Sequence, residues 1–389
     1  MIAIKNGRII TPEKIIEDKV LFIKKDRIYS IADSAEGAEK IINAHGRYIM
    51  PGLIDVHSDK VEQYIQPRPT SELDFEFALK ACERDLLGAG ITTMYHSLSL
   101  FHDEFFGKSS LRTRENVQKI ADLIDNIHMR NHLIHHRLHL RIEIDNMNAF
   151  DIVRDMITQG KVHLISFMDH TPGQGQYRSL AVYADTISKY NGKEIDTMGF
   201  EGVVEYHKNK TVLSFEQLKE LTDLAHAKGI AVASHDDDTE EKLSINKKIG
   251  VDISEFPITP ETAKAAKDHG FYTVVGSPNI LRGGSHSGNM SAADAILADS
   301  ADLLCSDYYP AAILNSIFLM HTKYGIPLYE MVNRATLNPA RATRTDRDFG
   351  SIEPGKKADL LVVDLLDGYP VITHVLVDGC TTSRIEYRR

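Results

Sequence analysis

The middle of the chain alternates short apolar segments with helix-like stretches, and this alternation constrains the fold more than any other feature. Eight segments rich in β-branched residues read as strands: Leu53–Val56, Ile91–His96, Leu138–Ile144, Val162–Met168, Ile230–Ala233, Asp252–Phe256, Tyr272–Val275 and Asp302–Cys305. The stretches between them have helical character, as in Thr113–Ile127 and Ser214–Lys228. Strands that alternate with helices form parallel sheets, and eight such units predict an α/β fold of the (β/α)8 TIM-barrel type.

Both ends of the chain have a different pattern. Short β-branched runs separated by Asn-Gly, Pro-Gly and Asp-Gly turn signals occupy the first fifty residues and return after Pro354. We therefore expect one small β-sandwich domain built from both termini. The predicted boundaries are residues 1–50 and 346–389 for this domain and 51–345 for the barrel.

Composition excludes several classes of protein. The 45 Lys and Arg against 55 Asp and Glu give a net charge of −10, which argues against nucleic acid or an anionic membrane as the main partner. Cys82, Cys305 and Cys380 are too widely spaced for a disulfide scaffold or a cysteine-rich zinc module. No apolar run approaches the ~18 residues of a membrane span. We expect a cytoplasmic protein.

The strongest local motif ends the first predicted barrel strand. PGLIDVHSD places His57 and Asp59 two residues apart, on one side of a strand. An isolated His-x-Asp is more often part of a polar loop than of a metal site. Here the motif lies where the N-terminal β region passes into the barrel, and reactive groups in such barrels lie at the C-terminal ends of strands. That position favours metal ligands.

Other strands end in similar groups. The segment LHLRIEID alternates apolar residues with His139, Arg141, Glu143 and Asp145, and charged side chains are less costly in the lumen than under the helices. Four further strands end in a histidine or a carboxylate, at Asp169-His170, His235, Glu255 and Asp307. Each alone is more often structural. Together they predict a metal site at the mouth of the barrel.

Two other segments are more ambiguous. Five histidines lie between Ile127 and His139, but without an H-E-x-x-H motif we interpret them as a solvated helix end. Gly276–Asn289 is a Gly/Ser loop that contains Arg282 and His286. An ordinary surface loop is possible there, although its place after the seventh strand favours an anion-binding loop.

The motifs resemble a known family. PGLIDVHSD, together with GSIEPGKKADLLVVD near the C-terminus, is similar to the amidohydrolase superfamily over essentially the whole chain. Within it, DVHSDKVEQYIQPRP, FMDHTPGQGQY, ASHDDDT, ISEFPIT and GSPNILRGGSHSGN resemble the PhnM diphosphatases of phosphonate metabolism. This resemblance implies hydrolysis of α-D-ribose 1-methylphosphonate 5-triphosphate to the 5-phosphate and pyrophosphate.

The resemblance also implies metal ligands, position by position. The superfamily's first-strand H-x-H is matched by His57 and, with a departure, by Asp59. His235 matches the fifth-strand histidine, Glu255 occupies the sixth-strand histidine position, and Asp307 is the eighth-strand aspartate.

We find no fourth-strand lysine of the kind that is carboxylated in many relatives. Glu143 or the pair Asp169 and His170 are alternatives for that ligand, and one or two metals per chain remain possible. Imidazole and carboxylate ligands suit zinc first, with iron or manganese as alternatives.

These assignments lead to a specific reaction. Asp307 is expected to orient the attacking water and accept its proton. Fixed cations would stabilise the phosphate oxygens, and the candidates are Lys60, Arg68, Arg141, Arg178, Arg282 and His286. We expect a ribosyl triphosphate as the small-molecule substrate, and a homodimer. The alternatives are a C–N hydrolase (a deaminase or cyclic amidase) and a non-catalytic barrel.

Overall fold

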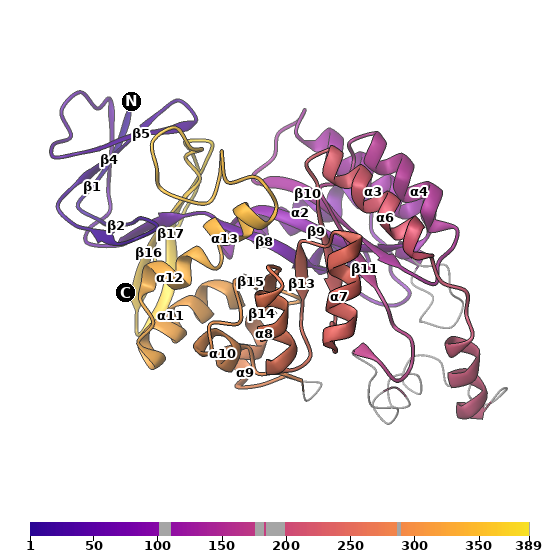
Figure 1. The fold of residues 1–389 in the computed structure, drawn as a ribbon. Helices are drawn as coiled ribbons and strands as arrows, with labels where there is room; N and C mark the ends of the chain where they lie inside the picture. Colours follow the sequence, from indigo (N-terminus) through magenta and orange to yellow (C-terminus); the bar gives the residue numbers. More distant parts are fainter. Residues whose placement is uncertain (101–109, 176–182, 184–198, 286–288, 389) are drawn as a thin grey trace.

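The structure is a computed structural model that describes residues 1–100, 110–175, 183, 199–285 and 289–388 (Figure 1). Its centre is an eight-stranded parallel sheet in which every strand pairs with the next one along the chain. The strands are β8 (Leu53–Ser58), β9 (Ile91–Leu100), β10 (His135–Glu143), β11 (Leu164–Met168), β12 (Ala231–His235), β13 (Ile253–Glu255), β14 (Tyr272–Gly276) and β15 (Leu303–Cys305). A parallel bridge between Ser58 and Asp307 brings the two edge strands together. The predicted barrel is confirmed.

Helices surround this sheet and bury its outer face (Figure 1). They are α1 (Lys60–Ile65), α2 (Phe75–Gly88), η1 (Ser110–Arg112), α3 (Arg114–Ile127), α4 (Ala149–Thr158), α6 (Phe215–Ala227), α7 (Glu240–Ile249), α8 (Pro260–Asp268), α9 (Ser277–Arg282), α10 (Ala292–Leu297), α11 (Ala312–Tyr324), α12 (Leu328–Asn333) and α13 (Leu337–Ala342). Local signals set their ends: Ser214 and Gln217 form a capping box on α6, and Gly250 ends α7 with a left-handed φ of 102°.

The two termini share two smaller sheets beside the barrel (Figure 1). The first has the order β5-β4-β1-β6 and the second the order β18-β17-β16-β7-β2-β3. Their strands are β1 (Ile2–Lys5), β2 (Arg8–Ile10), β3 (Ile15–Ile16), β4 (Val20–Lys24), β5 (Arg27–Ala32), β6 (Lys40–Asn43), β7 (Tyr48–Pro51), β16 (Leu360–Leu366), β17 (Tyr369–Val377) and β18 (Cys380–Arg384).

One apolar core joins the two sheets and both ends of the chain. Leu21 and Ile23 from the first sheet pack with Ile49, Leu360 and Val362 from the second. Strand β7 pairs antiparallel with β16, so residues near either end of the sequence share one ladder. These mixed sheets fit the separate small domain that the sequence predicts.

One expected loop is partly helical. Within the Gly276–Asn289 segment, Ser277–Arg282 form α9, which begins with Pro278 in its first turn and ends at Gly283 with a φ of 78°. Proline near the start and glycine after the end are normal helix signals, and the glycine-rich composition obscured them. Residues 286–288 lie outside the described part of the chain.

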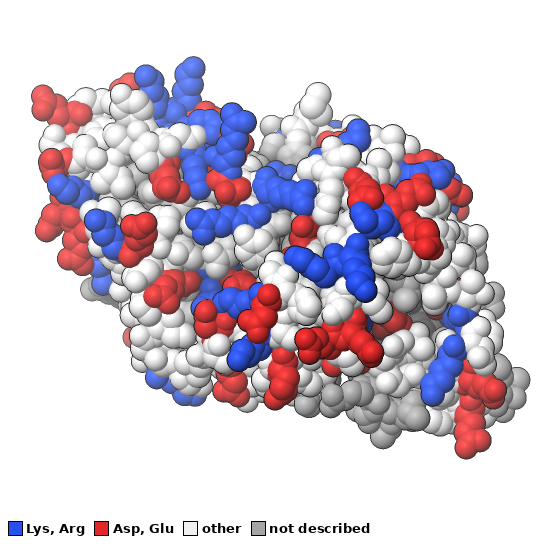
Figure 2. Space-filling model, in the orientation of Figure 1, with Lys and Arg blue, Asp and Glu red and all other residues white. Residues whose placement is uncertain are grey.

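Two further properties concern the surface. Among the helices of the described residues, none has an apolar stretch long enough to cross a membrane. On the face drawn in Figure 2, acidic and basic side chains are interspersed over both the barrel and the β domain.

Candidate metal centre and active site

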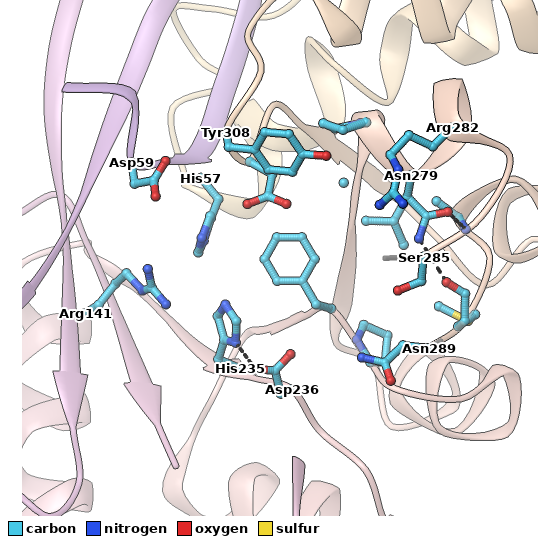
Figure 3. A pocket seen from close by; sticks show the side chains of 18 residues that line it. His57, Asp59, Arg141, His235, Asp236, Asn279, Arg282, Ser285, Asn289 and Tyr308 are labelled. Carbon is cyan, nitrogen blue, oxygen red and sulfur yellow. Dashed lines mark hydrogen bonds and ion pairs between the residues drawn. The ribbon is translucent and has the colours of Figure 1, made fainter. Parts of the chain in front are cut away.

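A cavity of about 620 Å³ opens where the barrel strands end. Two kinds of wall enclose it (Figure 3). One wall carries His57, Asp59, Arg141, His235 and Asp236, and the other carries Asn279, Arg282, Ser285 and Asn289. Asp307 and Tyr308 also line the cavity. The first wall therefore holds ionisable groups and potential metal ligands, whereas the second is mostly neutral and polar, with a single guanidinium.

The floor of this site is a buried group of His57, His139 and Glu255. His57 Nδ1 lies 3.0 Å from Glu255 Oε1, and His139 Nε2 lies 3.8 Å from Glu255 Oε2. One potential ligand atom from each residue lies within 4.8 Å of the others. The three residues come from β8, β10 and β13, so only closure of the sheet brings them together.

Burial keeps these imidazoles in the form that binds metals. It lowers the pKa of His57 well below its ordinary value, and the nearby Arg141 lowers it further. Burial also lowers the pKa of His139 to about 3. The backbone carbonyl of Val56 can accept a hydrogen bond only from a protonated Nδ1 of His139, at 2.9 Å, which leaves a lone pair on Nε2. Neutral imidazole is the metal-binding form.

His235 is oriented by a neighbouring carboxylate. Its Nδ1 lies 2.7 Å from Asp236 Oδ2, and its buried Nε2 has no hydrogen-bond partner among the described residues. Burial opposes the charge on Asp236, but His235 outweighs this effect and holds the pKa of that carboxyl below its ordinary value. A carboxylate that orients one nitrogen so that the other points into a cavity is the usual support of a metal-binding histidine.

Three residues that follow barrel strands have left-handed backbone conformations. The φ values are 53° for Asp236, 54° for Phe256 and 56° for Asp307. Phenylalanine is rarely found there, because its Cβ crowds the backbone, and such strain concentrates at functional sites. The Phe256 ring lies 5.0 Å from the rings of both His57 and His235, so the unusual backbone places an apolar wall against the histidines.

Asp307 lies at the seam of the barrel. Its N–H donates to the His57 carbonyl at 3.0 Å, and its own carbonyl accepts from Asp59 N–H at 3.3 Å. The carboxylate lines the cavity, and so does Asp59, whose buried Oδ1 has no hydrogen-bond partner among the described residues.

Glu143 and His170 form an ion pair next to this site. His170 Nδ1 lies 2.8 Å from Glu143 Oε2. Burial opposes both charges, but the pair outweighs it, so that the pKa of Glu143 is lowered and that of His170 is raised. Neither residue lines the cavity, whereas His57 and His235 do.

Some of the expected phosphate-binding residues lie elsewhere. The structure brings Arg141 and Arg282 to the cavity but not Lys60 or Arg68. Lys60 begins α1, and its Nζ lies 3.8 Å from Asp85 on α2, while Arg68 is exposed in the turn after α1. Both follow the His-x-Asp motif in sequence, but α1 carries them away from the lumen. Arg178 and His286 lie outside the described residues.

One interpretation of the sequence was wrong. His135, His136 and His139 do not belong to a solvated helix end, because they lie in β10, where His136 and His139 are fully buried. His139 was therefore missed as a candidate ligand, although the alternation of LHLRIEID already placed it on the lumen face. The polar wall formed by Asn279 and Asn289 had no signal in the sequence, since lone asparagines are common in loops.

The donor set fits a divalent cation. His57, His139 and His235, with the carboxylates of Glu255 and Asp307, surround one end of the lumen. The buried Glu255 Oε2 and His235 Nε2 have no hydrogen-bond partner among the described residues. Nitrogen and oxygen ligands of this kind suit zinc, iron and manganese alike.

Comparisons with known proteins agree with this architecture. The model of the Amidohydrolase family matches residues 48–385. The chain is 30% identical over 385 residues to the Escherichia coli α-D-ribose 1-methylphosphonate 5-triphosphate diphosphatase, covering 97% of this chain and 98% of the relative. A Clostridioides difficile dihydroorotase is 38% identical over 97 residues, which are 24% of this chain and 21% of that enzyme.

Solved structures support the fold. The Pasteurella multocida N-acetylglucosamine-6-phosphate deacetylase superposes with a TM-score of 0.66 at 13% identity, covering 97% of this chain and 98% of that one. The Klebsiella pneumoniae 5-methylcytosine deaminase gives a TM-score of 0.64 at 14% identity, with coverage of 100% and 99%. At these identities the likeness extends to the fold alone.

Proposed function

The chain belongs to the amidohydrolase family, and on this premise we propose that it hydrolyses α-D-ribose 1-methylphosphonate 5-triphosphate to the 5-phosphate and pyrophosphate. The observation that carries the proposal is one cavity in which metal-type ligands face two arginines. Similarity to a diphosphatase over nearly the whole chain supports the same reaction. Two guanidiniums are more than a neutral cyclic amide requires, and they suit a triphosphate.

The cation would be held by His57, His139, His235 and Glu255, with Asp307 beside it. When bound, a divalent cation at such a site lowers the pKa of water towards ~7 and stabilises negative charge on phosphoryl oxygens. Asp307 is positioned for the proton transfer, since its backbone is fixed to β8 on both sides while its carboxylate lines the cavity.

The reaction balances with these groups. Oxygen from water bonds to the α-phosphorus, the bond from that phosphorus to the bridging oxygen breaks, and pyrophosphate leaves. Asp307 accepts the proton of the attacking water. Arg141 and Arg282, on opposite walls, are placed to stabilise the charge that grows on the phosphate oxygens (Figure 3).

Isotope labelling tests this proposal directly. With the ribosyl triphosphate in ¹⁸O-water, attack on the α-phosphorus places the label in the ribosyl 5-phosphate and none in pyrophosphate. Label in pyrophosphate, or release of orthophosphate instead, would contradict the proposed site of cleavage. Ammonia release from a nucleobase or ring opening of a cyclic amide, without cleavage of the triphosphate, would instead support the C–N hydrolase alternative.

A matched pair of variants tests the role of Asp307. Asp307→Asn removes the proton acceptor, and we expect kcat to fall by about a hundredfold or more. Asp367→Asn is the control, because Asp367 has a similar φ of 53° but is exposed in the hairpin between β16 and β17. Equal kcat in both variants would remove Asp307 from the chemistry.

A further inference from the structure

A second cluster of potential ligands lies where the barrel meets the β domain. His135 is the first residue of β10, Asp359 directly precedes β16, and Asp378 directly follows β17. From the geometry of these three side chains we propose a second divalent-metal site, separate from the cavity, which joins the two domains. Its ligand atoms are one imidazole nitrogen and two carboxylate oxygens, a set that suits zinc and similar transition-metal ions.

The distances between these atoms fit a shared ion. His135 Nε2 lies 3.0 Å from Asp359 Oδ2 and 3.9 Å from Asp378 Oδ2, and one ligand atom from each residue lies within 4.8 Å of the others. Zinc binds nitrogen and oxygen at ~2.0–2.2 Å, so two ligands of one tetrahedral ion lie roughly 3–3.5 Å apart. The distance of 3.9 Å between His135 Nε2 and Asp378 Oδ2 would have to shorten by roughly 0.4–0.9 Å for both atoms to bind one ion.

The short approach between His135 and Asp359 is not explained by a hydrogen bond. His135 Nε2 and Asp359 Oδ2 are both buried atoms without a hydrogen-bond partner among the described residues, because their mutual direction is unsuitable. Asp359 is only 7% exposed. A buried carboxylate oxygen that is aimed at an imidazole nitrogen without bonding to it is a costly arrangement unless a third group lies between them.

Each carboxylate is also fixed by its other oxygen. Asp359 Oδ1 accepts from the Asp378 N–H at 2.8 Å, and Asp378 Oδ1 accepts from Lys357 Nζ at 2.7 Å. These contacts hold the Oδ2 atoms near His135. Outer contacts that orient ligands in this way are typical of metal sites.

The local charge favours a cation. Lys357 is shared between Asp26, at 3.0 Å, and Asp378, while Asp359 has no lysine or arginine within 4 Å among the described residues. With His135 neutral, the carboxylates of Asp359 and Asp378 thus face a single ammonium group. The competing interpretation is an ion pair without a metal, in which a protonated His135 contacts the two carboxylates.

This site is separate from the proposed active-site metal. His135 begins β10, and four residues at ~3.3 Å each place it about 13 Å along the strand from His139, its nearest proposed ligand. Metal binding at the two positions is therefore separable by mutation. A bound ion would connect the barrel to both C-terminal strands, so it should also stabilise the whole chain against unfolding.

The test measures metal content and stability together. The full-length protein is stripped with a chelator, reloaded with Zn²⁺, freed of excess metal and analysed by mass spectrometry. We expect His135→Asn and Asp378→Asn each to hold one equivalent less zinc than the wild type. Asparagine suits the left-handed φ of 49° at Asp378 and can still accept from Lys357, so that variant should fold. His45→Asn, at an exposed left-handed histidine of the β domain, is the control.

Further measurements separate this site from the proposed active site. Zn²⁺ should raise the melting temperature of the wild type and of His57→Asn, but less in His135→Asn, while kcat of His135→Asn stays at the wild-type value. Co²⁺ added to His57→Asn should give a visible absorption band that His135→Asn/His57→Asn lacks. Equal zinc content in wild type, His135→Asn and Asp378→Asn would overturn the proposal and leave an ion pair. That result would not affect the proposed hydrolase activity.

Discussion

Strand β10 has a buried histidine beside a buried glutamate on each of its two faces. On the lumen face, His139 lies near Glu255, and on the helix face, His136 lies 3.3 Å from Glu83 of α2. All four side chains are at most 3% exposed. Residue type and burial are therefore the same on both faces, yet the lumen glutamate also contacts His57, which lines the cavity.

The two faces differ in whether the glutamate oxygens already have hydrogen-bond partners. On the helix face, His136 Nδ1 lies 2.9 Å from His96 Nε2, and Glu83 Oε2 also accepts from Leu133 N–H at 2.9 Å. Lys80 lies 3.3 Å from the other oxygen of Glu83. On the lumen face, Glu255 Oε2 has no hydrogen-bond partner among the described residues. On the helix face both oxygens of Glu83 have partners, although the buried His96 Nδ1 has none among the described residues, whereas on the lumen face the glutamate itself keeps an oxygen with capacity for a ligand.

The largest expected effect comes from the lumen side. His235→Asn keeps most of the volume but removes the Nε2 lone pair, so bound metal and kcat should fall together, kcat by about a hundredfold or more. His57→Asn should behave in the same way. Metal analysis and steady-state kinetics on the ribosyl triphosphate provide the measurement. Full metal occupancy in both variants would remove these histidines from the ligand set.

On the helix side, the expected loss is in stability and not in activity. Glu83→Ala leaves the buried His136 Nε2 and the Leu133 N–H without their acceptor, and we expect the free energy of unfolding to fall by about 3 kcal/mol. Metal content and kcat should be unchanged. The control is Glu76→Ala on the same helix, because its ion pair with Arg130 is exposed and should contribute less than about 1 kcal/mol. A variant of Glu83 that lost metal would contradict the distinction between the two faces.

Strand β10 and the neighbouring strands were predictable from the sequence, but the contacts between their side chains across the lumen were not. Periodicity located each barrel strand within a few residues, and the alternation of LHLRIEID placed His139, Arg141 and Glu143 on the lumen face. That His139 meets Glu255, 116 positions away in the sequence, depends on closure of the sheet and on the register of every strand between them. Short local patterns do not contain that information.

The hydrogen-bond partners of these buried groups were equally unpredictable from the sequence. Glu83 looks like any acidic residue of an amphipathic helix, and His136 was grouped with a solvated helix end. Their burial results from the packing of α2 and α3 on β9 and β10, which no local motif encodes. Asp359 reads as the first residue of a strand and Asp378 as part of an Asp-Gly turn, and only the docking of the β domain places them near His135.

The pH dependence of unfolding sharpens the comparison. A histidine that the fold keeps neutral makes the protein less stable in acid, because only the unfolded chain binds the proton. Burial lowers the pKa of His163 to about 3, while its Nδ1 accepts from the Leu138 N–H of β10 at 3.1 Å. The unfolded chain has a histidine pKa near ~6.5, so it binds a proton that the folded chain does not. The contribution of His163 is therefore complete above this pH and is lost progressively as the pH falls towards 3.

Between pH 6.5 and 5, this one site should lower the free energy of unfolding by about 1.5 kcal/mol. His163→Asn keeps an acceptor for Leu138 N–H but cannot titrate, so its stability should fall less steeply over that interval. Urea unfolding at several pH values measures the slope. Parallel pH profiles of the variant and the wild type would show that His163 is not held neutral by the fold.

The smallest effect is expected at the second wall of the cavity, where Arg282 ends α9. Its side chain is exposed, so solvent weakens its attraction for phosphate, and it should contact the triphosphate in the ground state and the transition state alike. Arg282→Ala should then raise KM by about tenfold with little change in kcat, whereas Arg141→Ala, in the buried wall near His57, should lower kcat. Metal content should stay constant in Arg282→Ala, because a guanidinium has no lone pair for a cation. A fall in kcat with unchanged KM would instead place Arg282 at the α-phosphorus. Wild-type values of both kcat and KM would mean that Arg282 lines the cavity without binding the substrate.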